Sequence, residues 1–188
     1  QNKMLPTNSG LRLVLASTSR YRKDLLSRLT IPFDIAVPDV DETPLPRELP
    51  AETALRLARN KAHAVVARFS GALIIGSDQV ADCEGVRLDK PMEYSKAVLQ
   101  LRHLSGKKVV FQTAVVLLNA RTGAMQGELV PTEVQFRTLQ NAEIERYLQA
   151  EPAYDCAGSA KSEGLGIALI DRIQSCDPTA LIGLPLIA

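Results

Sequence analysis

The stretch LRLVLASTSRYRKDLLSRL, residues 11–29, joins a short apolar strand to a helix through a run of hydroxyl residues. Residues 11–16 predict the strand, and Ser19 is placed to cap the helix that follows. The first turn of a helix presents free N–H groups and the positive end of the helix dipole, which favour a bound anion. Arg20 and Arg22 add positive charge at the same place. The stretch therefore predicts an α/β fold with a phosphate site at its first strand–helix turn.

The remaining chain continues to alternate between the two kinds of element. Further strands are expected at 33–38, 72–81, 109–120, 128–139 and 166–174, and helices at 51–69, 93–105 and 141–150. Ser95 is a candidate cap for the second of these helices, and Asp177-Pro178 predicts a final helix that continues past Ala188. Strands that alternate with helices are typical of an α/β protein.

Composition excludes several classes of protein. The chain has 188 residues, of which 46% are hydrophobic and 23% charged, as in an ordinary globular protein. A net charge of +1 provides no broad field for stable nucleic-acid binding, and no apolar run approaches the roughly 20 residues that cross a bilayer. Residues 1–10 are a polar tail without the apolar core of a secretory signal. Cys83, Cys156 and Cys176 lack metal-site spacing and indicate a reduced, cytoplasmic protein.

Two further segments carry chemical groups. GSDQV at 76–80 places the acid Asp78 at the end of an apolar strand. CAGSAKSEG at 156–164 predicts a loop of small residues that also holds Lys161 and Glu163. A phosphate cradle, an acid and a polar loop together indicate an enzyme that acts on a phosphorylated small molecule.

These segments also belong to a longer ordered set. The strings LASTSRYR, VDE, RLARNKA, GSDQV, DKP, FQTAV and AGSAKSEGLG follow one another between Leu11 and Ala188. In this order the chain resembles the Maf family of nucleoside triphosphate pyrophosphatases. The resemblance implies a two-lobed, twisted mixed β-sheet flanked by helices, like that of inosine triphosphate pyrophosphatase, with the active site in the cleft between the lobes. It also implies a single catalytic domain over 11–188, a divalent metal ion (Mg²⁺ or Mn²⁺) and a homodimer.

The implied reaction makes definite demands on the site. Water attacks the α-phosphate of a nucleotide and releases pyrophosphate, so the site must neutralise charge, bind the metal and orient the water. The candidate phosphate ligands are Ser17, Arg22, Lys61 and Lys90. Glu42 and Asp78 are candidate oxygen ligands of the metal. By resemblance, Asp78 is also the acid that accepts the proton.

Each candidate has a plainer alternative when taken alone. Lys61 lies on a charged helix and can belong to a solvated face, and Asp78 can be an ordinary turn residue. Ser17 and Ser19 can be helix caps, and Glu42 can be exposed in its proline-rich loop. Their joint occurrence is what favours the functional interpretation.

Three positions bear on the choice of base, namely Tyr21, Gln79 and Glu163. SDQV and KSEG resemble the branch that hydrolyses 7-methyl-GTP, because the dTTP and UTP branch has threonine after the acid and glutamine in the late loop. N7-methylation makes guanine a cation, which strengthens stacking on the ring of Tyr21 by about 0.5–2 kcal/mol. Glu163 can accept hydrogen bonds from guanine N1–H and N2–H₂. The alternatives are the same reaction on dTTP, UTP or a modified nucleotide, and a non-catalytic nucleotide-binding regulator of cell division.

Overall fold

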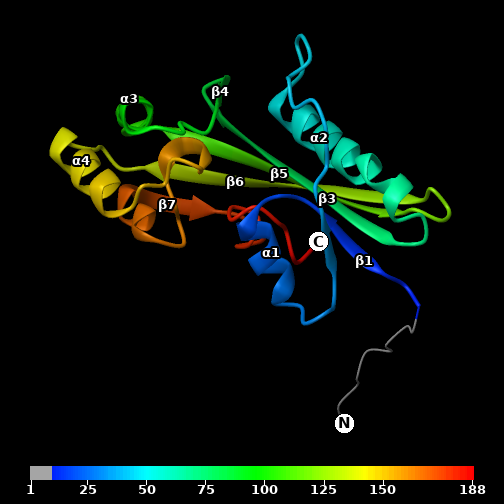
Figure 1. Ribbon diagram of the computed structural model, residues 1–188. Coiled ribbons are helices and arrows are strands. Elements are labelled where there is room, and N and C mark those ends of the chain that lie inside the picture. The colour runs from blue at the N-terminus through cyan, green and yellow to red at the C-terminus, as the bar shows by residue number, and fades with distance from the viewer. Residues whose placement is uncertain (1–9) are drawn as a thin grey trace.

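The computed structural model describes residues 10–188 as seven strands and four α-helices (Figure 1). The strands are β1 (Leu13–Ala16), β2 (Asp34–Ala36), β3 (Leu73–Cys83), β4 (Val86–Leu88), β5 (Lys108–Asn119), β6 (Met125–Phe136) and β7 (Ile170–Gln174). The helices are α1 (Arg20–Ser27), α2 (Pro50–Ala64), α3 (Tyr94–Leu104) and α4 (Asn141–Ala150), with short 3₁₀ turns at Val66–Arg68, Ala157–Ser159 and Leu165–Leu169. No helix formed by residues 10–188 is long and apolar enough to cross a membrane.

All seven strands form one open, mixed sheet in the order β2-β1-β3-β5-β6-β7, with β4 beside β3. β1 runs parallel to β2 and β3, and the remaining pairs are antiparallel. β1 and β4 pair with the same edge of β3, at Leu73–Gly76 and at Ala81–Cys83. Among the described residues, 77–80 consequently have no strand neighbour on this edge, and Asp78 lies there. The expectation that Asp78 ends its strand is wrong, because β5 pairs with β3 from Leu73 to Asp82.

The sheet carries two halves, which β3, β5 and β6 join (Figure 1). In the first half, α2 packs against one face, where a Cβ on Gly76 would lie 2.1 Å from the carbonyl oxygen of Ala58. Leu25 and Leu26 of α1 pack with Leu15 and Leu184 in a separate cluster. In the second half, apolar residues of α3 and α4 pack with those of β3, β5 and β6. This arrangement confirms the predicted α/β, two-lobed architecture.

The final helix expected after Asp177 does not form. The carboxylate of Asp177 is buried and accepts hydrogen bonds from the backbone N and the hydroxyl of Thr179, at 2.9 and 2.6 Å. Its other oxygen accepts from the backbone N of Ile187 at 2.9 Å, which folds residues 177–188 back on themselves. Gly183 has a φ of +137°, which a helix cannot accommodate. Residues 177–188 thus form a folded C-terminal segment.

Two smaller expectations also need correction. Ser95 lies inside α3, whose N-cap is Glu93, and its hydroxyl donates to the Glu93 carboxylate at 3.0 Å. The strand expected over 166–174 begins only at Ile170, because a 3₁₀ turn precedes it. Ser19 is confirmed as the N-cap of α1, and its hydroxyl oxygen accepts from the backbone N of Arg22. The predicted tail 1–10 lies outside the described residues except for Gly10.

Candidate active site

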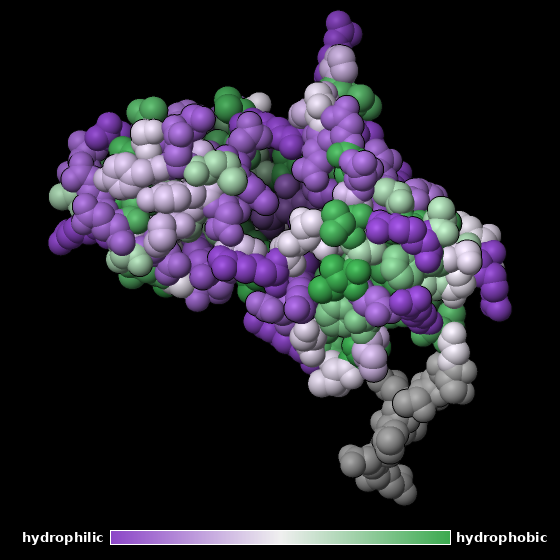
Figure 2. All heavy atoms as spheres, viewed as in Figure 1, coloured by the Kyte–Doolittle hydropathy of each residue, from purple (hydrophilic) through white to green (hydrophobic). Residues whose placement is uncertain are grey.

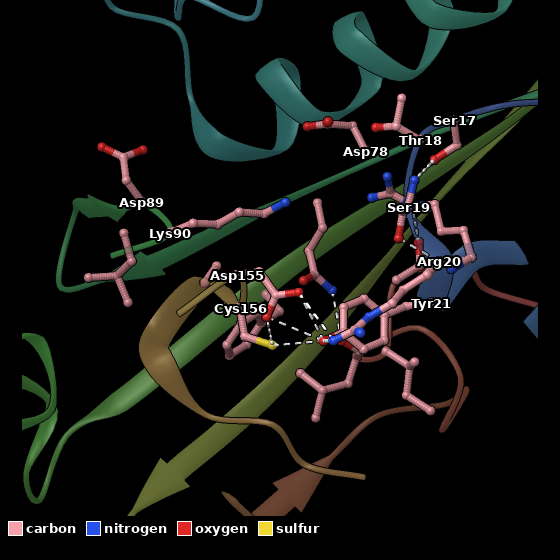
Figure 3. A pocket seen from close by; sticks show the side chains of 18 of the residues that line it. Ser17, Thr18, Ser19, Arg20, Tyr21, Asp78, Asp89, Lys90, Asp155 and Cys156 are labelled. Carbon is pink, nitrogen blue, oxygen red and sulfur yellow. Dashed lines mark hydrogen bonds and ion pairs between the residues drawn. The ribbon is translucent and has the colours of Figure 1, made fainter. Parts of the chain in front are cut away.

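A cavity of about 720 Å³ opens where the edge of β3 is unpaired. Its walls come from the β1–α1 turn, α2, β3, the chain after β4, the loop around Asp155 and the C-terminal segment (Figure 3). Figure 2 shows the hollow between the two halves of the molecule, bordered mainly by hydrophilic residues. Every predicted site residue lines this cavity: Ser17, Tyr21, Arg22, Glu42, Lys61, Asp78, Gln79, Lys90 and Glu163. Residues spread over most of the sequence therefore meet in one place.

Asp78, Lys61 and Glu42 form the charged centre of the cavity. The Lys61 ammonium lies 2.7 Å from Oδ1 of Asp78 and 3.0 Å from Oε1 of Glu42. The side chains of Lys61 and Asp78 are each 9% exposed, whereas that of Glu42 is 59% exposed. Burial tends to raise the pKa of Glu42, but the hydrogen bond from Lys61 and the nearby cations outweigh it and lower the pKa. Both carboxylates therefore face the cavity beside one cation.

Strand geometry explains how Asp78 and Lys61 meet. Alternate residues of a strand point to the same face, so Asp78 and Gly76 both face α2, where Lys61 lies. Since Gly76 carries no side chain, α2 can approach β3 closely. Lys61, which the sequence alone left open as a solvated residue, is buried.

The loop that carries Glu42 is fastened to α2 by an ion pair. Nε of Arg56 lies 2.6 Å from Oε1 of Glu48, and its Nη2 donates to the carbonyl oxygen of Thr43 at 3.1 Å. Glu48 also accepts from the backbone N of Leu45 at 3.0 Å. The hydrogen bond from Arg56 is the main cause that lowers the pKa of Glu48 to about 2. These contacts fix the part of the loop that follows Glu42.

The β1–α1 turn places a cation next to this centre. Its hydroxyl groups organise the turn: Oγ of Ser17 accepts from the backbone N of Ser19 at 3.0 Å. Nε of Arg22 donates to the carbonyl oxygen of Gly183 at 2.8 Å. Burial lowers the pKa of Arg22, while the charges of Asp78 and Glu42 act to raise it. The helix cap is Ser19, so the plainer alternative holds for Ser19 and is wrong for Ser17, which organises the turn and also lines the cavity.

Lys90 reaches the centre from the opposite side. Its side chain extends from the chain after β4 towards Asp78 (Figure 3). Its charge contributes to the lowered pKa of Glu42. Lys61, Lys90 and Arg22 consequently surround the two carboxylates with three cations, as a polyphosphate requires.

The two carboxylates fit a divalent cation that is shared with a substrate. In residues 10–188, no three His, Cys, Asp or Glu side chains are grouped closely enough to hold a metal by themselves. Mg²⁺ is commonly held by one or two carboxylates together with substrate phosphates. Glu42 and Asp78, which contact the same ammonium group from within one cavity, can supply such a pair of oxygen ligands.

Tyr21 lies at the other end of the cavity and joins its two sides. Its hydroxyl lies 3.1 and 3.3 Å from the carboxylate oxygens of Asp155 and accepts from Nη2 of Arg20 at 3.0 Å. The guanidinium of Arg20 lies 4.9 Å from the centroid of the Tyr21 ring, and Nζ of Lys161 lies 5.9 Å from it. Two cations of the protein therefore already lie within cation–π distance of this ring. Desolvation by burial is the main cause that raises the pKa of Tyr21 to about 12.

Gln79 and Glu163 line the cavity in different ways. The amide nitrogen of Gln79 lies within 3.1 Å of Oγ1 of Thr113 and of the carbonyl oxygens of Ala180 and Leu181. Gln79 therefore supports the C-terminal segment and points away from the face that carries Asp78. Glu163 is exposed and also borders a neighbouring cavity of about 210 Å³.

Sequence reasoning missed Asp155 as a member of this site. It directly precedes the CAGSAKSEG segment, and this position next to a motif was the only available signal. No local pattern links Asp155 to Tyr21, which is 134 residues away in the chain.

Residues 12–188 match the family described as Maf-like protein. The chain belongs to the Maf family. Its Maf relatives include proteins of Burkholderia pseudomallei (strain 1710b), 56% identical over 94% of this chain and 84% of the relative, and of Polaromonas sp., 58% identical over 96% and 83%. A third, from Albidiferax ferrireducens, is 55% identical over 94% of this chain and 88% of the relative. All three Maf relatives are named 7-methyl-GTP pyrophosphatase.

Proposed function

We propose that this chain is a hydrolase that cleaves 7-methyl-GTP to 7-methyl-GMP and pyrophosphate, with residues 11–188 acting as one catalytic domain. The observation that carries the proposal is the buried Lys61–Asp78 pair beside Glu42, which faces a cavity where Arg22 and Lys90 also converge. Relatives that are 55–58% identical and share the name 7-methyl-GTP pyrophosphatase support the choice of substrate. A cytoplasmic location stays a prediction from the cysteines, and a homodimer stays a prediction from the family resemblance.

In the proposed reaction, Asp78 accepts a proton from the water that attacks the α-phosphorus. The bond from that phosphorus to the oxygen bridging the α- and β-phosphates breaks, and pyrophosphate leaves with the bond's electron pair. Arg22 and Lys90 neutralise the charge on the phosphate chain, while Lys61 holds the Asp78 carboxylate in position at 2.7 Å. Glu42 and Asp78 would hold Mg²⁺ or Mn²⁺, which supplies further charge neutralisation when bound.

The base would lie between Tyr21 and Glu163. A methylated guanine is a cation and gains about 0.5–2 kcal/mol from the face of an aromatic ring. The Glu163 carboxylate accepts two hydrogen bonds from guanine, where uracil or thymine offers one such donor. Gln79, whose amide nitrogen supports the wall of the cavity, would act on the base through the shape of that wall.

Pyrophosphate release from a panel of triphosphates tests the proposal. The purified protein is incubated with Mg²⁺ or Mn²⁺ and with 7-methyl-GTP, GTP, dTTP or UTP. We expect 7-methyl-GTP to have the highest kcat/KM. A preference for UTP or dTTP would retain the pyrophosphatase and reject the proposed base. If folded protein releases no pyrophosphate from any of them, the proposed enzyme is wrong and a nucleotide-binding regulator replaces it.

Two substitutions test the assignment of the base contacts. Gln79→Thr and Glu163→Gln together should remove the preference for 7-methyl-GTP over UTP. Glu145→Gln, at an exposed position of α4, is the matched control for loss of a negative charge. A preference that survives both changes would contradict the roles given to these residues.

A further inference from the structure

The hydroxyl of Tyr21 bridges the two halves of the molecule. Tyr21 is the second residue of α1, whereas Asp155 lies after α4 in the second half. Their contacts of 3.1 and 3.3 Å cross the cavity that both residues line (Figure 3). Arg20 joins the same group through Nη2, which donates to the Tyr21 hydroxyl and lies 3.6 Å from Oδ2 of Asp155.

The Asp155 side of this bridge is firmly anchored. Ser159 is completely buried, and its hydroxyl donates to Oε1 of Gln100 in α3 at 2.6 Å. Its carbonyl oxygen accepts from the hydroxyl of Tyr147 in α4 at 2.9 Å. Gly158 has a φ of +75°, and a Cβ there would lie 3.4 Å from the ring of Phe111. The loop therefore presents Asp155 from a fixed conformation.

The Tyr21 side depends on this anchor for its orientation. Tyr21 lies in the first turn of α1, and its ring is only partly buried. A side chain at such a position ordinarily chooses among several rotamers. With its hydroxyl in contact with Asp155, Tyr21 lines the cavity, and Lys161 and Arg20 lie within cation–π distance of its ring.

We propose that Asp155 is a positioning residue, which holds the Tyr21 ring in the orientation that stacks on a cationic base. This inference rests on the proposed function, because it assigns Tyr21 to base recognition. Asp155 acts through Tyr21, so it contributes to the affinity for the base and not to the rate of cleavage at the α-phosphate. Its carboxylate also adds negative charge at the end of the cavity that takes the positively charged purine.

The test compares Asp155→Ala, Asp155→Asn and Tyr21→Phe, and combines the first and last in a double-mutant cycle. The values of kcat and KM are measured with 7-methyl-GTP as substrate. Calorimetry gives the dissociation constant of 7-methyl-GMP. Pyrophosphate, which has no base, is used as an inhibitor to probe the phosphate end alone. Asp24→Ala, an exposed position of the same helix as Tyr21, is the matched control.

We expect Asp155→Ala to raise the KM for 7-methyl-GTP about tenfold, which is the effect of losing one hydrogen bond to a charged group. The value of kcat and the inhibition constant of pyrophosphate should stay within about twofold, because the phosphate end is unchanged. Asp155→Asn, which can still accept from the Tyr21 hydroxyl, should restore most of the affinity. In the Tyr21→Phe background, Asp155→Ala should add little.

Additive effects in the double-mutant cycle would overturn the inference, as would an equal loss of affinity for pyrophosphate. Wild-type protein that fails to hydrolyse 7-methyl-GTP contradicts the proposed function alone, since binding of 7-methyl-GMP still tests Asp155. Wild-type protein that binds no 7-methyl-GMP contradicts both. An active wild type with an indistinguishable Asp155→Ala variant contradicts only the role of Asp155.

Discussion

The two ends of the cavity are built in different ways. At the phosphate end, Asp78 and Lys61 project from the interiors of β3 and α2, and both side chains are 9% exposed. At the base end, Arg20 and Asp155 lie at the start of a helix and in a loop, with side chains that are 70% and 45% exposed. The difference indicates that the groups proposed for the chemical step are fixed in packed elements, whereas those proposed to choose the base lie where substitution disturbs the core least.

Substitution of the acid at the phosphate end should have the largest effect. We expect Asp78→Asn to lower kcat by about 10²–10⁴-fold, the usual cost of losing a general base, while nucleotide binding remains measurable. Asp82→Asn, at a partly buried position of the same strand, is the matched control. Turnover near the wild-type rate in Asp78→Asn would end the proposed mechanism.

Substitutions at the two ends should also differ strongly in their effect on the free energy of unfolding. Lys61→Met leaves the buried Asp78 carboxylate without its cation, so we expect the free energy of unfolding to fall by about 3 kcal/mol. Arg20→Met, at the base end, should leave urea unfolding nearly unchanged, since exposed ion pairs contribute little. Adding Asp78→Asn to Lys61→Met should recover part of the loss. Equal destabilisation by Lys61→Met and Arg20→Met would remove the distinction between the ends.

A larger aromatic ring at residue 21 should increase the selectivity for a methylated base. Tryptophan is a stronger cation–π partner than tyrosine, and its indole N–H can donate to Asp155 in place of the lost hydroxyl. Tyr21→Trp should therefore increase the preference for 7-methyl-GTP over GTP by about threefold. The chain has no tryptophan, so the fluorescence of the new residue reports on binding directly. Tyr94→Trp, at an exposed position of α3, is the control that should not respond to nucleotide. An unchanged preference, with fluorescence indifferent to 7-methyl-GMP, would exclude stacking at residue 21.

The smallest effect concerns pH and the loop that holds Glu42. The pKa of Glu48 is lowered to about 2 from an ordinary value of 4.5, so its ion pair with Arg56 stabilises the folded state fully above pH 4.5. This stabilisation is lost as the pH falls from 4.5 towards 2. The difference in urea midpoint between wild type and Glu48→Gln should therefore shrink over that range, whereas Glu145→Gln should show no such trend. A constant difference from pH 6 to pH 3 would contradict the assignment.

Local signals in the sequence predicted much of the fold. Ser19 marked the start of α1, and alternating strands and helices indicated the α/β sheet. The motifs allowed the candidate residues to be grouped. They did not allow the geometry of the site to be predicted, because no spacing in the sequence reveals that Lys61 lies 2.7 Å from Asp78. All of the candidates line one cavity, and their individual roles in catalysis and recognition stay predictions.

Two of the failures arise from contacts that join residues ten or more positions apart. The C-terminal segment has the local pattern of a helix start, yet Asp177 bonds the backbone of Ile187 and closes a loop. Asp155 meets Tyr21 only because the sheet brings the two halves together. Neither contact leaves a periodic trace in the sequence, since each depends on tertiary structure.

The long strands give the cleft mechanical stiffness. β3, β5 and β6 pass from one half to the other without interruption, and ladder hydrogen bonds join them along most of their lengths. Hinge motion needs a few residues that can absorb large changes in φ and ψ, and paired residues in the middle of a sheet cannot do so. A nucleotide would therefore enter a gap of nearly constant width. Enclosure of the nucleotide would then depend on movements of the surrounding loops and side chains, without a closing of one half upon the other.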